Sequence, residues 1–111
     1  MVDVSCVDDP VARRFLEEKI TDIRRIFAPL HIIVFGSRAA GKAREESDID
    51  LILVSDRFRN KRFPDRMAEF QLAINPEPDV EAFCYTPEEF EIMRKQVSIV
   101  AEAARDGIWI Q

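Results

Sequence analysis

Two short runs in this sequence are apolar at every position, and they limit the fold more than any other feature does. Residues 32–35 read Ile-Ile-Val-Phe, and residues 51–54 read Leu-Ile-Leu-Val. A strand with one solvated face alternates polar and apolar side chains, whereas a strand covered on both faces is apolar throughout. The two runs therefore predict strands over residues 31–35 and 48–54, inside a covered sheet.

The segments around these strands carry helix signals. Asp9 and Pro10 are typical of an N-cap and a first helical position, and apolar residues then recur at helical spacing up to Ala28. Residues 86–89, Thr-Pro-Glu-Glu, have the pattern of a capping box that opens a helix to about residue 95. Further helices are predicted over residues 64–74 and 98–105, further strands over 80–85 and 108–110, and a short helix with a loop over 38–46. This alternation predicts a single α/β or α+β domain over residues 1–111, with helices packed on one sheet.

Charge and composition exclude several classes of protein. The 111 residues include 16 basic and 21 acidic side chains, which gives a formal net charge of −5. A protein that binds nucleic acid by counterion release needs a basic face, so nucleic acid is not an indicated partner. The first residues are charged, and no stretch approaches the roughly 18 to 20 apolar residues of a membrane span. We therefore expect a soluble protein without a signal peptide.

The cysteines indicate the cellular compartment. Cys6 and Cys84 lie far apart in the sequence, and no second pair accompanies them. They suggest neither a zinc site nor a disulfide framework. The cytoplasm, which is reducing, is therefore the expected location.

One basic stretch interrupts this acidic chain between the second strand and the helix that follows it. Its basic residues alternate with phenylalanines, in the order Arg57, Phe58, Arg59, Lys61, Arg62 and Phe63. A solvated loop is the first interpretation, and contact with a triphosphate, RNA or an acidic partner is the alternative. The aromatic content of 9% is too low to indicate a base-stacking platform.

Two aspartates stand where the second predicted strand enters the core. Asp48 and Asp50 are two residues apart, so on a strand they project from the same face, roughly 6 to 7 Å apart. Carboxylates about 5 Å apart repel by roughly 3 kcal/mol at an effective dielectric constant near 20. A Mg²⁺ ion would offset this repulsion, because carboxylate oxygens are the hard ligands that it prefers. The alternative is a solvated strand end at which Asp48 caps a turn.

Gly36 and Ser37 follow directly after the first predicted strand. Backbone N–H groups and a hydroxyl at such a position can hold phosphate. Glycine lets the backbone approach a ligand closely, and serine adds a neutral donor that does not compete for a metal. Arg38 and Lys42 are then expected to offset phosphate charge. Together with Asp48 and Asp50, the pair predicts a magnesium site beside a loop that binds polyphosphate.

The stretch FGSRAAGKAREESDIDLILV, residues 35–54, resembles the signature of the minimal nucleotidyltransferases of the DNA polymerase beta superfamily. Residues 82–95 and 98–110 resemble the C-terminal part of these proteins, so the resemblance covers about residues 30–111. It implies an α+β fold with a small mixed sheet of three to four strands flanked by helices. It also implies transfer of a nucleoside monophosphate from a nucleoside triphosphate to an acceptor.

The family's site residues carry over position by position. Gly36 and Ser37 match the pair that binds the triphosphate, and Asp48 and Asp50 match the two metal-binding aspartates. The family usually has a third carboxylate, an Asp, on the next strand, where it serves as a metal ligand or as a base. This position falls on Glu81, and Asp79, two residues earlier, is the alternative.

The resemblance further implies the cofactors and partners of the reaction. We expect a two-metal Mg²⁺ site and a nucleoside triphosphate donor, with ATP as donor and AMP as the transferred group. Ser37 is expected to position the β- and γ-phosphates, and Glu81 to complete the metal site and deprotonate the acceptor. A competing implication is an antitoxin-like or nucleotide-binding subunit that pairs with a helical HEPN-type protein, with weak or no catalysis. A domain of this size is also expected to pair with a second copy or a partner.

Overall fold

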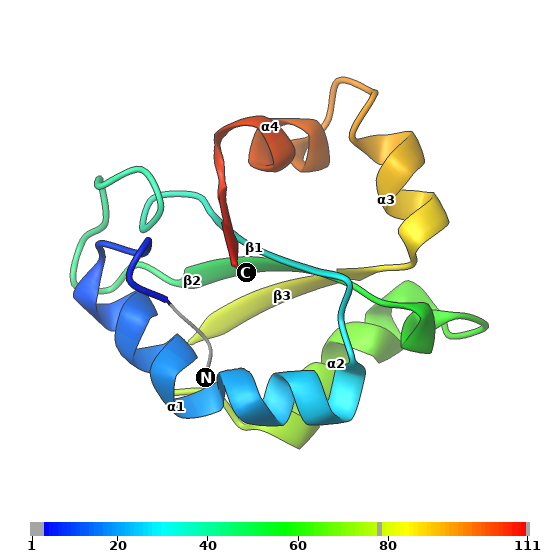
Figure 1. The fold of residues 1–111 in the computed structure, drawn as a ribbon, viewed down its shortest axis with the longest axis horizontal. Coiled ribbons are helices and arrows are strands. Elements are labelled where there is room, and N and C mark those ends of the chain that lie inside the picture. The colour runs from blue at the N-terminus through cyan, green and yellow to red at the C-terminus, as the bar shows by residue number, and fades with distance from the viewer. Residues whose placement is uncertain (1–3, 78, 111) are drawn as a thin grey trace.

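The computed structural model describes residues 4–77 and 79–110, whose arrangement is shown in Figure 1. The strands are β1 (His31–Phe35), β2 (Ile49–Val54), β3 (Val80–Tyr85) and β4 (Ile108–Ile110). The helices are α1 (Pro10–Phe27), α2 (Phe63–Ile74), α3 (Pro87–Met93) and α4 (Ile99–Asp106), and a short 3₁₀ helix spans Asp56–Phe58. These bounds agree closely with the predicted ones, except between residues 38 and 46.

The strands form one mixed sheet in the order β3-β2-β1-β4. β1 pairs antiparallel with both β2 and β4, whereas β2 and β3 run parallel. The two continuous apolar runs therefore occupy the two central strands. The α+β fold with a small mixed sheet flanked by helices is confirmed.

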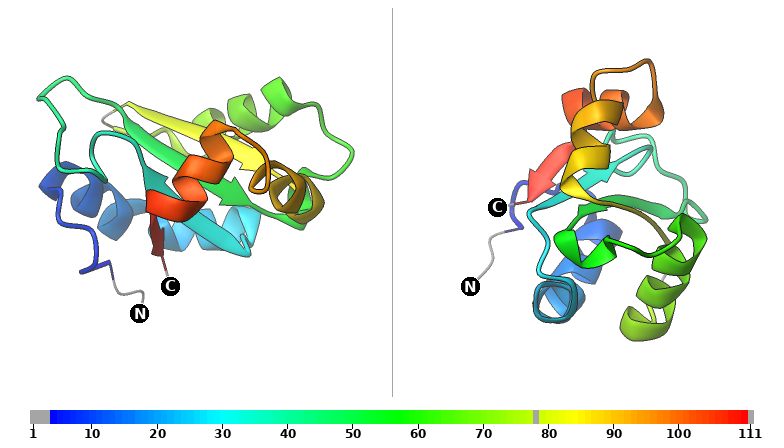
Figure 2. Two further views of the ribbon diagram at one scale, coloured as in Figure 1. Left: turned by 90° about the horizontal axis from the view of Figure 1, so that it is seen from above. Right: turned by 90° about the vertical axis from the view of Figure 1, so that its right-hand side faces the viewer.

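Helices cover both faces of this sheet, as Figures 1 and 2 show. Leu51 and Leu53 of β2 belong to the core under α1 and α2, while Ile52 and Val54 belong to the core under α3 and α4. Successive strand side chains point to opposite faces, so β2 contributes to both cores in turn. This explains why the strand is apolar at every position from residue 51 onwards.

The helix ends follow from local side-chain chemistry. Asp9 caps α1 by accepting a hydrogen bond from the Ala12 N–H at 2.9 Å, and Thr86 and Glu89 form the predicted capping box of α3. α1 ends where Ala28 takes a left-handed conformation with φ of 44°. Within residues 4–77 and 79–110, no helix combines the length and the apolar content that a membrane crossing requires.

Residues 38–46 form turns, and the predicted short helix is absent there. The N–H of Ala40 donates to the carbonyl oxygen of Gly36 at 3.0 Å, as in one helical turn. Gly41 then takes a φ of +73°, which interrupts the helical path. The carbonyl oxygens of residues 44, 45 and 47 accept hydrogen bonds from the Arg38 side chain instead. The Arg38 side chain therefore holds residues 44–47 in a path that is not helical, although their composition favours a helix.

α4 approaches β1 closely at Gly107, the residue that ends the helix. A Cβ atom at Gly107 would lie 2.4 Å from the carbonyl oxygen of Ala103 and 2.7 Å from Cγ2 of Ile33. A larger residue would push α4 away from the sheet. The close approach also sets the position of α4, which forms one wall of the pocket described below.

Both cysteines are free thiols, with Cys6 exposed and Cys84 buried in β3. Burial raises the pKa of Cys84 to about 12. Because the thiolate is the reactive form, Cys84 has the properties of a core residue.

Candidate active site

The parallel pairing of β2 and β3 places two acidic residues side by side. Asp50 is opposite Glu81 in the register of the two strands. Both residues lie on the face that carries Ile52 and Tyr85, since alternate strand residues share a face. Asp50 is half-buried and Glu81 is exposed. The two carboxyl groups therefore meet on the α3 and α4 face, near the start of both strands.

The surroundings of Asp50 change its ionisation. Burial is the main cause that raises the pKa of Asp50 to about 6. The charge of Glu81, a hydrogen bond between the two carboxyl groups and the charge of Asp48 are the smaller causes of the same shift. Like charges close together disfavour ionisation, and a nearby cation would favour it. Asp50 therefore takes up a proton below about pH 6, and above that pH its carboxylate carries the charge to attract a cation.

Gly36 is in direct contact with this pair. It lies in the turn after β1 with a φ of +76°, a conformation that favours glycine. A Cβ atom at this position would lie 2.3 Å from Oδ2 of Asp50. The Asp50 carboxylate thus occupies the space that any other residue at position 36 would need. The contact joins the turn after β1 to the acidic pair.

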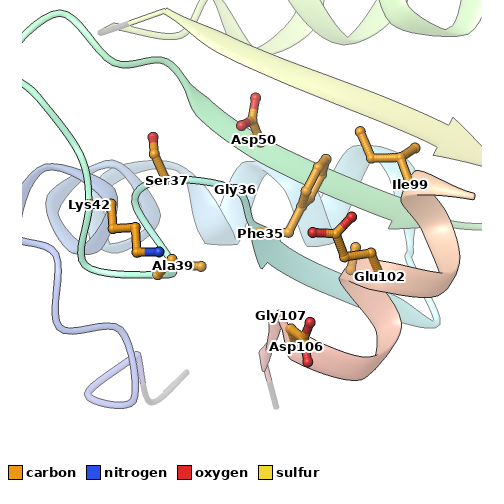
Figure 3. A pocket seen from close by; sticks show the side chains of 12 residues that line it. Phe35, Gly36, Ser37, Ala39, Lys42, Asp50, Ile99, Glu102, Asp106 and Gly107 are labelled. Atoms are coloured by element: carbon orange, nitrogen blue, oxygen red, sulfur yellow. The ribbon is translucent and has the colours of Figure 1, made fainter.

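A pocket of about 440 Å³ lies between this turn and α4 (Figure 3). Figure 3 shows the Ser37 hydroxyl and the Asp50 carboxylate pointing in the same direction, with Glu102 on the facing wall. The lining residues are Phe35, Gly36, Ser37, Ala39, Ala40, Lys42, Asp50, Ile99, Glu102, Ala103, Asp106 and Gly107. Its volume is within the usual range for small-molecule sites. Gly36, Ser37, Lys42 and Asp50, which the sequence singled out, therefore share one pocket.

The other two predicted carboxylates lie outside the Asp50 and Glu81 pair. Asp48 is exposed just before β2, where its charge reaches Asp50. Asp79 is exposed just before β3, and its carbonyl oxygen accepts a hydrogen bond from the N–H of Ile49 at 3.0 Å. In the part of the chain that the structure describes, no three His, Cys, Asp or Glu residues are grouped so that they could hold a metal ion. The sequence predicted that Asp48, Asp50 and Glu81 converge, and among the described residues two of them, Asp50 and Glu81, lie side by side.

Arg38 does not face the pocket, contrary to the expectation that it offsets phosphate charge. Its side chain is only 5% exposed and is turned into the loop and towards Asp9. It is not among the residues that line the 440 Å³ pocket, whereas Lys42 is exposed and lines it. Lys42 therefore keeps its expected position beside the turn at Gly36 and Ser37, and Arg38 does not.

Sequence reasoning missed the wall that α4 provides. Ile99, Glu102, Ala103 and Asp106 line the pocket and recur at intervals of three and four residues, so they share one helix face. This spacing is visible in the sequence. Which element the face meets depends on the packing of α4 against β1, and no local pattern indicates that packing.

The basic stretch at residues 57–62 lies away from the pocket. Arg59 forms ion pairs with Asp56 and Glu88 at 2.6 and 2.7 Å, and Lys61 pairs with Glu69 at 2.9 Å. The partner Arg59 lowers the pKa of Glu88. Exposed pairs of this kind contribute little to stability. Arg59 and Lys61 are therefore paired with the protein's own acids, while Phe58 between them and β2 is buried in the core.

The raised pKa of Asp50 predicts how stability depends on pH. The folded protein protonates Asp50 near pH 6, whereas the usual pKa is 3.8. The folded state therefore binds more protons between these values, so lowering the pH from about 7.5 to about 5 should raise the free energy of unfolding. Because Asp50 is only half-buried, solvent screening limits its share to about 1 kcal/mol.

Urea denaturation at a series of pH values measures this effect. The variant Asp50→Asn is the control, because it removes the titrating group and leaves the other titrating groups in place. We expect the wild-type protein to gain stability relative to this variant as the pH falls. Parallel pH profiles for the two proteins would contradict the raised pKa.

Comparison with known proteins identifies the family. A family model for the nucleotidyltransferase domain matches residues 16–107, which is most of the chain. The chain therefore belongs to the nucleotidyltransferase domain family, and nucleotidyl transfer is the general activity that this membership supports. A search of curated proteins found no significant match.

A solved structure shares the fold. The crystal structure of a candidate nucleotidyltransferase from Sulfolobus solfataricus is similar to this chain, with a TM-score of 0.63. The match covers 96% of this chain and 87% of that chain, at 20% sequence identity. At this identity the similarity supports the fold, and function has to be inferred from the site itself.

Proposed function

We propose that the protein is a minimal nucleotidyltransferase that moves a nucleoside monophosphate from a nucleoside triphosphate to an acceptor in a Mg²⁺-dependent reaction. ATP is the proposed donor, so AMP is the transferred group. The observation that carries the proposal is the pairing of Asp50 with Glu81 directly beside the Gly36-Ser37 turn. Family membership supports the general reaction, and this pairing supplies the chemistry that it needs.

The residues present fit a magnesium site. Asp50 and Glu81 offer hard oxygen ligands, and their mutual repulsion contributes to the raised pKa of Asp50. Mg²⁺ commonly takes one or two protein carboxylates, keeps several waters and binds substrate phosphates, so three converging side chains are not required. We assign Asp50 and Glu81 as ligands, with Asp48 beside them as the further ligand of a two-metal site. Bound Mg²⁺ supplies neutralisation of the triphosphate and of the leaving pyrophosphate.

The other residues that line the pocket beside Asp50 have separate tasks in this proposal. The Ser37 hydroxyl and the turn at Gly36 hold the β- and γ-phosphates, and Lys42 offsets part of their charge. Phe35 and Ile99 offer an apolar surface to the nucleoside, since both line the pocket. The triphosphate is thus oriented before the reaction begins.

The transfer step follows in-line phosphoryl chemistry. The acceptor oxygen attacks the α-phosphorus and forms a new P–O bond. The bond from the α-phosphorus to the oxygen that bridges to the β-phosphorus breaks, and pyrophosphate leaves. Glu81 accepts the proton of the acceptor hydroxyl. It suits this role because it lies opposite Asp50 on the neighbouring strand and is exposed, so it can contact the acceptor and pass the proton to solvent.

Transfer of label from α-labelled ATP tests this function. The protein is incubated with Mg²⁺, each of the four triphosphates in turn, and candidate acceptors that include co-purified proteins and RNA. We expect label on one acceptor, release of pyrophosphate and loss of both when EDTA is added. Isothermal titration calorimetry with each Mg²⁺·triphosphate complex provides a readout that needs no acceptor. Absence of binding for all four complexes would overturn the proposal.

The variants Glu81→Gln and Asp79→Asn decide which residue is the third carboxylate. Both changes remove one negative charge from the start of β3, but only Glu81 adjoins Asp50. We expect Glu81→Gln to lower transfer by about a hundredfold or more, as is typical for loss of a general base or metal ligand. Asp79→Asn is expected to keep transfer within about twofold. The reverse order of effects would assign the role to Asp79.

A second candidate function is an interaction subunit that binds nucleotide and pairs with a helical HEPN-type protein, with weak or no catalysis. Exposed apolar side chains around the α3 and α4 connection favour it. Ile92, Val97 and Ile99 are more than half exposed, and Ile99 also lines the pocket. A partner that covered these residues would lie at the pocket entrance, where it could also present an acceptor hydroxyl.

The two functions separate in one experiment. The protein is mixed with the co-purified partner, α-labelled ATP and Mg²⁺, and the mixture is analysed by size-exclusion chromatography and by gel. Label on the partner supports transfer, and a stable unlabelled complex supports the interaction subunit. The variant Val97→Asp should weaken either complex, with Leu72→Asp on α2 as the matched control, because Leu72 is also exposed but lies in the helix on the opposite face of the sheet.

A further inference from the structure

We propose that Arg38 is a positioning residue that closes the loop between β1 and β2, and that it does not bind the triphosphate. Arg38 follows Ser37 directly, and its guanidinium reaches the residue that precedes Asp48. It therefore ties the phosphate turn to the start of the strand that carries the acidic residues. This inference rests on the proposed function, because it concerns how the proposed site keeps its geometry.

The hydrogen bonds of the guanidinium connect the two ends of the loop. Nε and Nη2 of Arg38 both donate to the carbonyl oxygen of Ser47, at 3.1 and 2.8 Å. Nη2 also lies within hydrogen-bond distance of the carbonyl oxygens of Arg44 and Glu45, at 3.2 and 3.3 Å. Three carbonyl groups of an irregular loop thus find their donor in one side chain. Without it, the carbonyl groups of Glu45 and Ser47 would lose this donor, whereas that of Arg44 would keep the N–H of Ser47 at 3.1 Å.

Asp9 holds the other side of the guanidinium. Nη1 of Arg38 lies 3.2 and 3.3 Å from the two carboxylate oxygens of Asp9. The same carboxylate caps α1 through the N–H of Ala12. The start of α1 and the phosphate loop are therefore joined through two side chains. Because the Arg38 side chain is almost fully buried, its position is determined by these contacts and not by solvent.

This arrangement needs the shape of arginine as well as its charge. A guanidinium donates in several directions from one plane, whereas a lysine ammonium is a compact point charge. If Arg38 held phosphate mainly through its charge, lysine would replace much of its effect, because lysine is also a common phosphate ligand. If Arg38 positions the loop, lysine can satisfy only part of the set of acceptors. The two roles therefore predict different results for Arg38→Lys.

The test uses the full chain with Arg38→Lys, Arg38→Met and the control Arg44→Met. Arg44 lies in the same loop and is exposed, so its variant removes a basic side chain without removing the guanidinium that closes the loop. Hydrogen exchange of residues 39–48 and the Kd of Mg²⁺·ATP are measured for each protein. Both Arg38 variants should raise exchange in the loop about tenfold or more and weaken Mg²⁺·ATP binding about ten- to a hundredfold, with Arg38→Lys between Arg38→Met and wild type. Arg44→Met should resemble the wild type, and exchange in β1 and β2 should stay slow in all proteins.

Asp9→Asn keeps the proposal testable if Arg38→Met does not fold. Asparagine is also a good N-cap, so this variant should preserve α1 while it weakens the hold on Arg38. It should raise both the hydrogen exchange of the loop and the Kd of Mg²⁺·ATP, each by a smaller factor than the Arg38 variants do. In combination with Arg38→Lys, its effect should be less than additive, because the two residues act through one contact.

The outcomes separate this inference from the proposed function. Faster loop exchange with unchanged Mg²⁺·ATP binding would show a role limited to loop structure and overturn the inference. Weaker binding with unchanged exchange, and full recovery in Arg38→Lys, would show a direct phosphate contact and overturn it as well. A wild-type protein that binds no triphosphate would overturn the proposed function and the inference together.

Discussion

The variant Asp50→Asn is expected to lose nucleotidyl transfer while the folded protein becomes more stable at about pH 7.5. The asparagine side chain has the size of aspartate but cannot provide a second negative charge for a metal ion. Loss of metal-assisted charge stabilisation is worth several kcal/mol, so transfer should fall by about a thousandfold or more. The fold should stay intact, because the change is nearly isosteric and Gly36 keeps the same neighbour.

The gain in stability has a separate cause. At neutral pH and above, Asp50 is ionised although its pKa is raised to about 6 from 3.8, so the folded state retains an unfavourable charge. A shift of this size corresponds to about 3 kcal/mol without screening. Because Asp50 is half-buried, we expect about 1 kcal/mol in practice, or roughly 4 to 8 °C in Tm. Differential scanning calorimetry and the labelling assay measure the two effects on the same samples.

Asp22→Asn on α1 is the control for both effects. Asp22 is paired with Arg25 at 3.2 Å in an exposed position, where the pair contributes little. Its variant should keep both transfer and Tm close to those of the wild type. If Asp50→Asn kept full transfer, Asp50 would not be a metal ligand. If Asp50→Asn were less stable than the wild type at pH 7.5, the charge of Asp50 would not destabilise the folded state.

The variant Gly36→Ala is expected to abolish triphosphate binding and to destabilise the fold. Two effects add at this position. A non-glycine residue at a φ of +76° costs about 1 to 2 kcal/mol. The new Cβ atom would also lie 2.3 Å from Oδ2 of Asp50, which forces the carboxylate to move. A displaced metal ligand should weaken binding of Mg²⁺·ATP by at least about a hundredfold, measured by calorimetry.

Gly41→Ala provides a matched control in the same loop. Gly41 has a similar φ of +73°, but nothing lies within 4 Å of a Cβ atom built there. It should therefore show the backbone cost without the displacement of Asp50, and so retain triphosphate binding. Equal losses of binding in the two variants would show that loop strain, and not the contact with Asp50, is responsible. In an Asp50→Ala background, Gly36→Ala should destabilise the fold less than it does in the wild type.

Much of the fold could be predicted because its signals are local. The N-cap at Asp9, the capping box at Thr86 and the apolar runs of β1 and β2 each act within a few residues. The family resemblance implied Glu81 as a third carboxylate on the strand after the aspartates, and the parallel register, which the structure provides, places it opposite Asp50. These predictions required only strand periodicity, the order of elements along the chain and the family resemblance.

The short helix predicted at residues 38–46 was wrong for a physical reason. Alanine and polar residues favour a helix locally, but the Arg38 side chain donates to the carbonyl groups of residues 44, 45 and 47 at the far end of the loop. The same contact keeps Arg38 out of the pocket, where its charge had suggested a place. Charge and propensity describe a residue alone, whereas its partners are known only after the chain has folded.

The sequence by itself determined the strands and the helix caps, because strand periodicity and capping chemistry act within a few residues of the backbone. Only the tertiary structure decided that Asp50 touches Gly36 and Glu81, that Glu102 on α4 closes the pocket and that Arg38 turns away from it. Those contacts join residues far apart in the chain. They depend on the register of β2 with β3 and on the packing of α4 against β1, which no local pattern encodes.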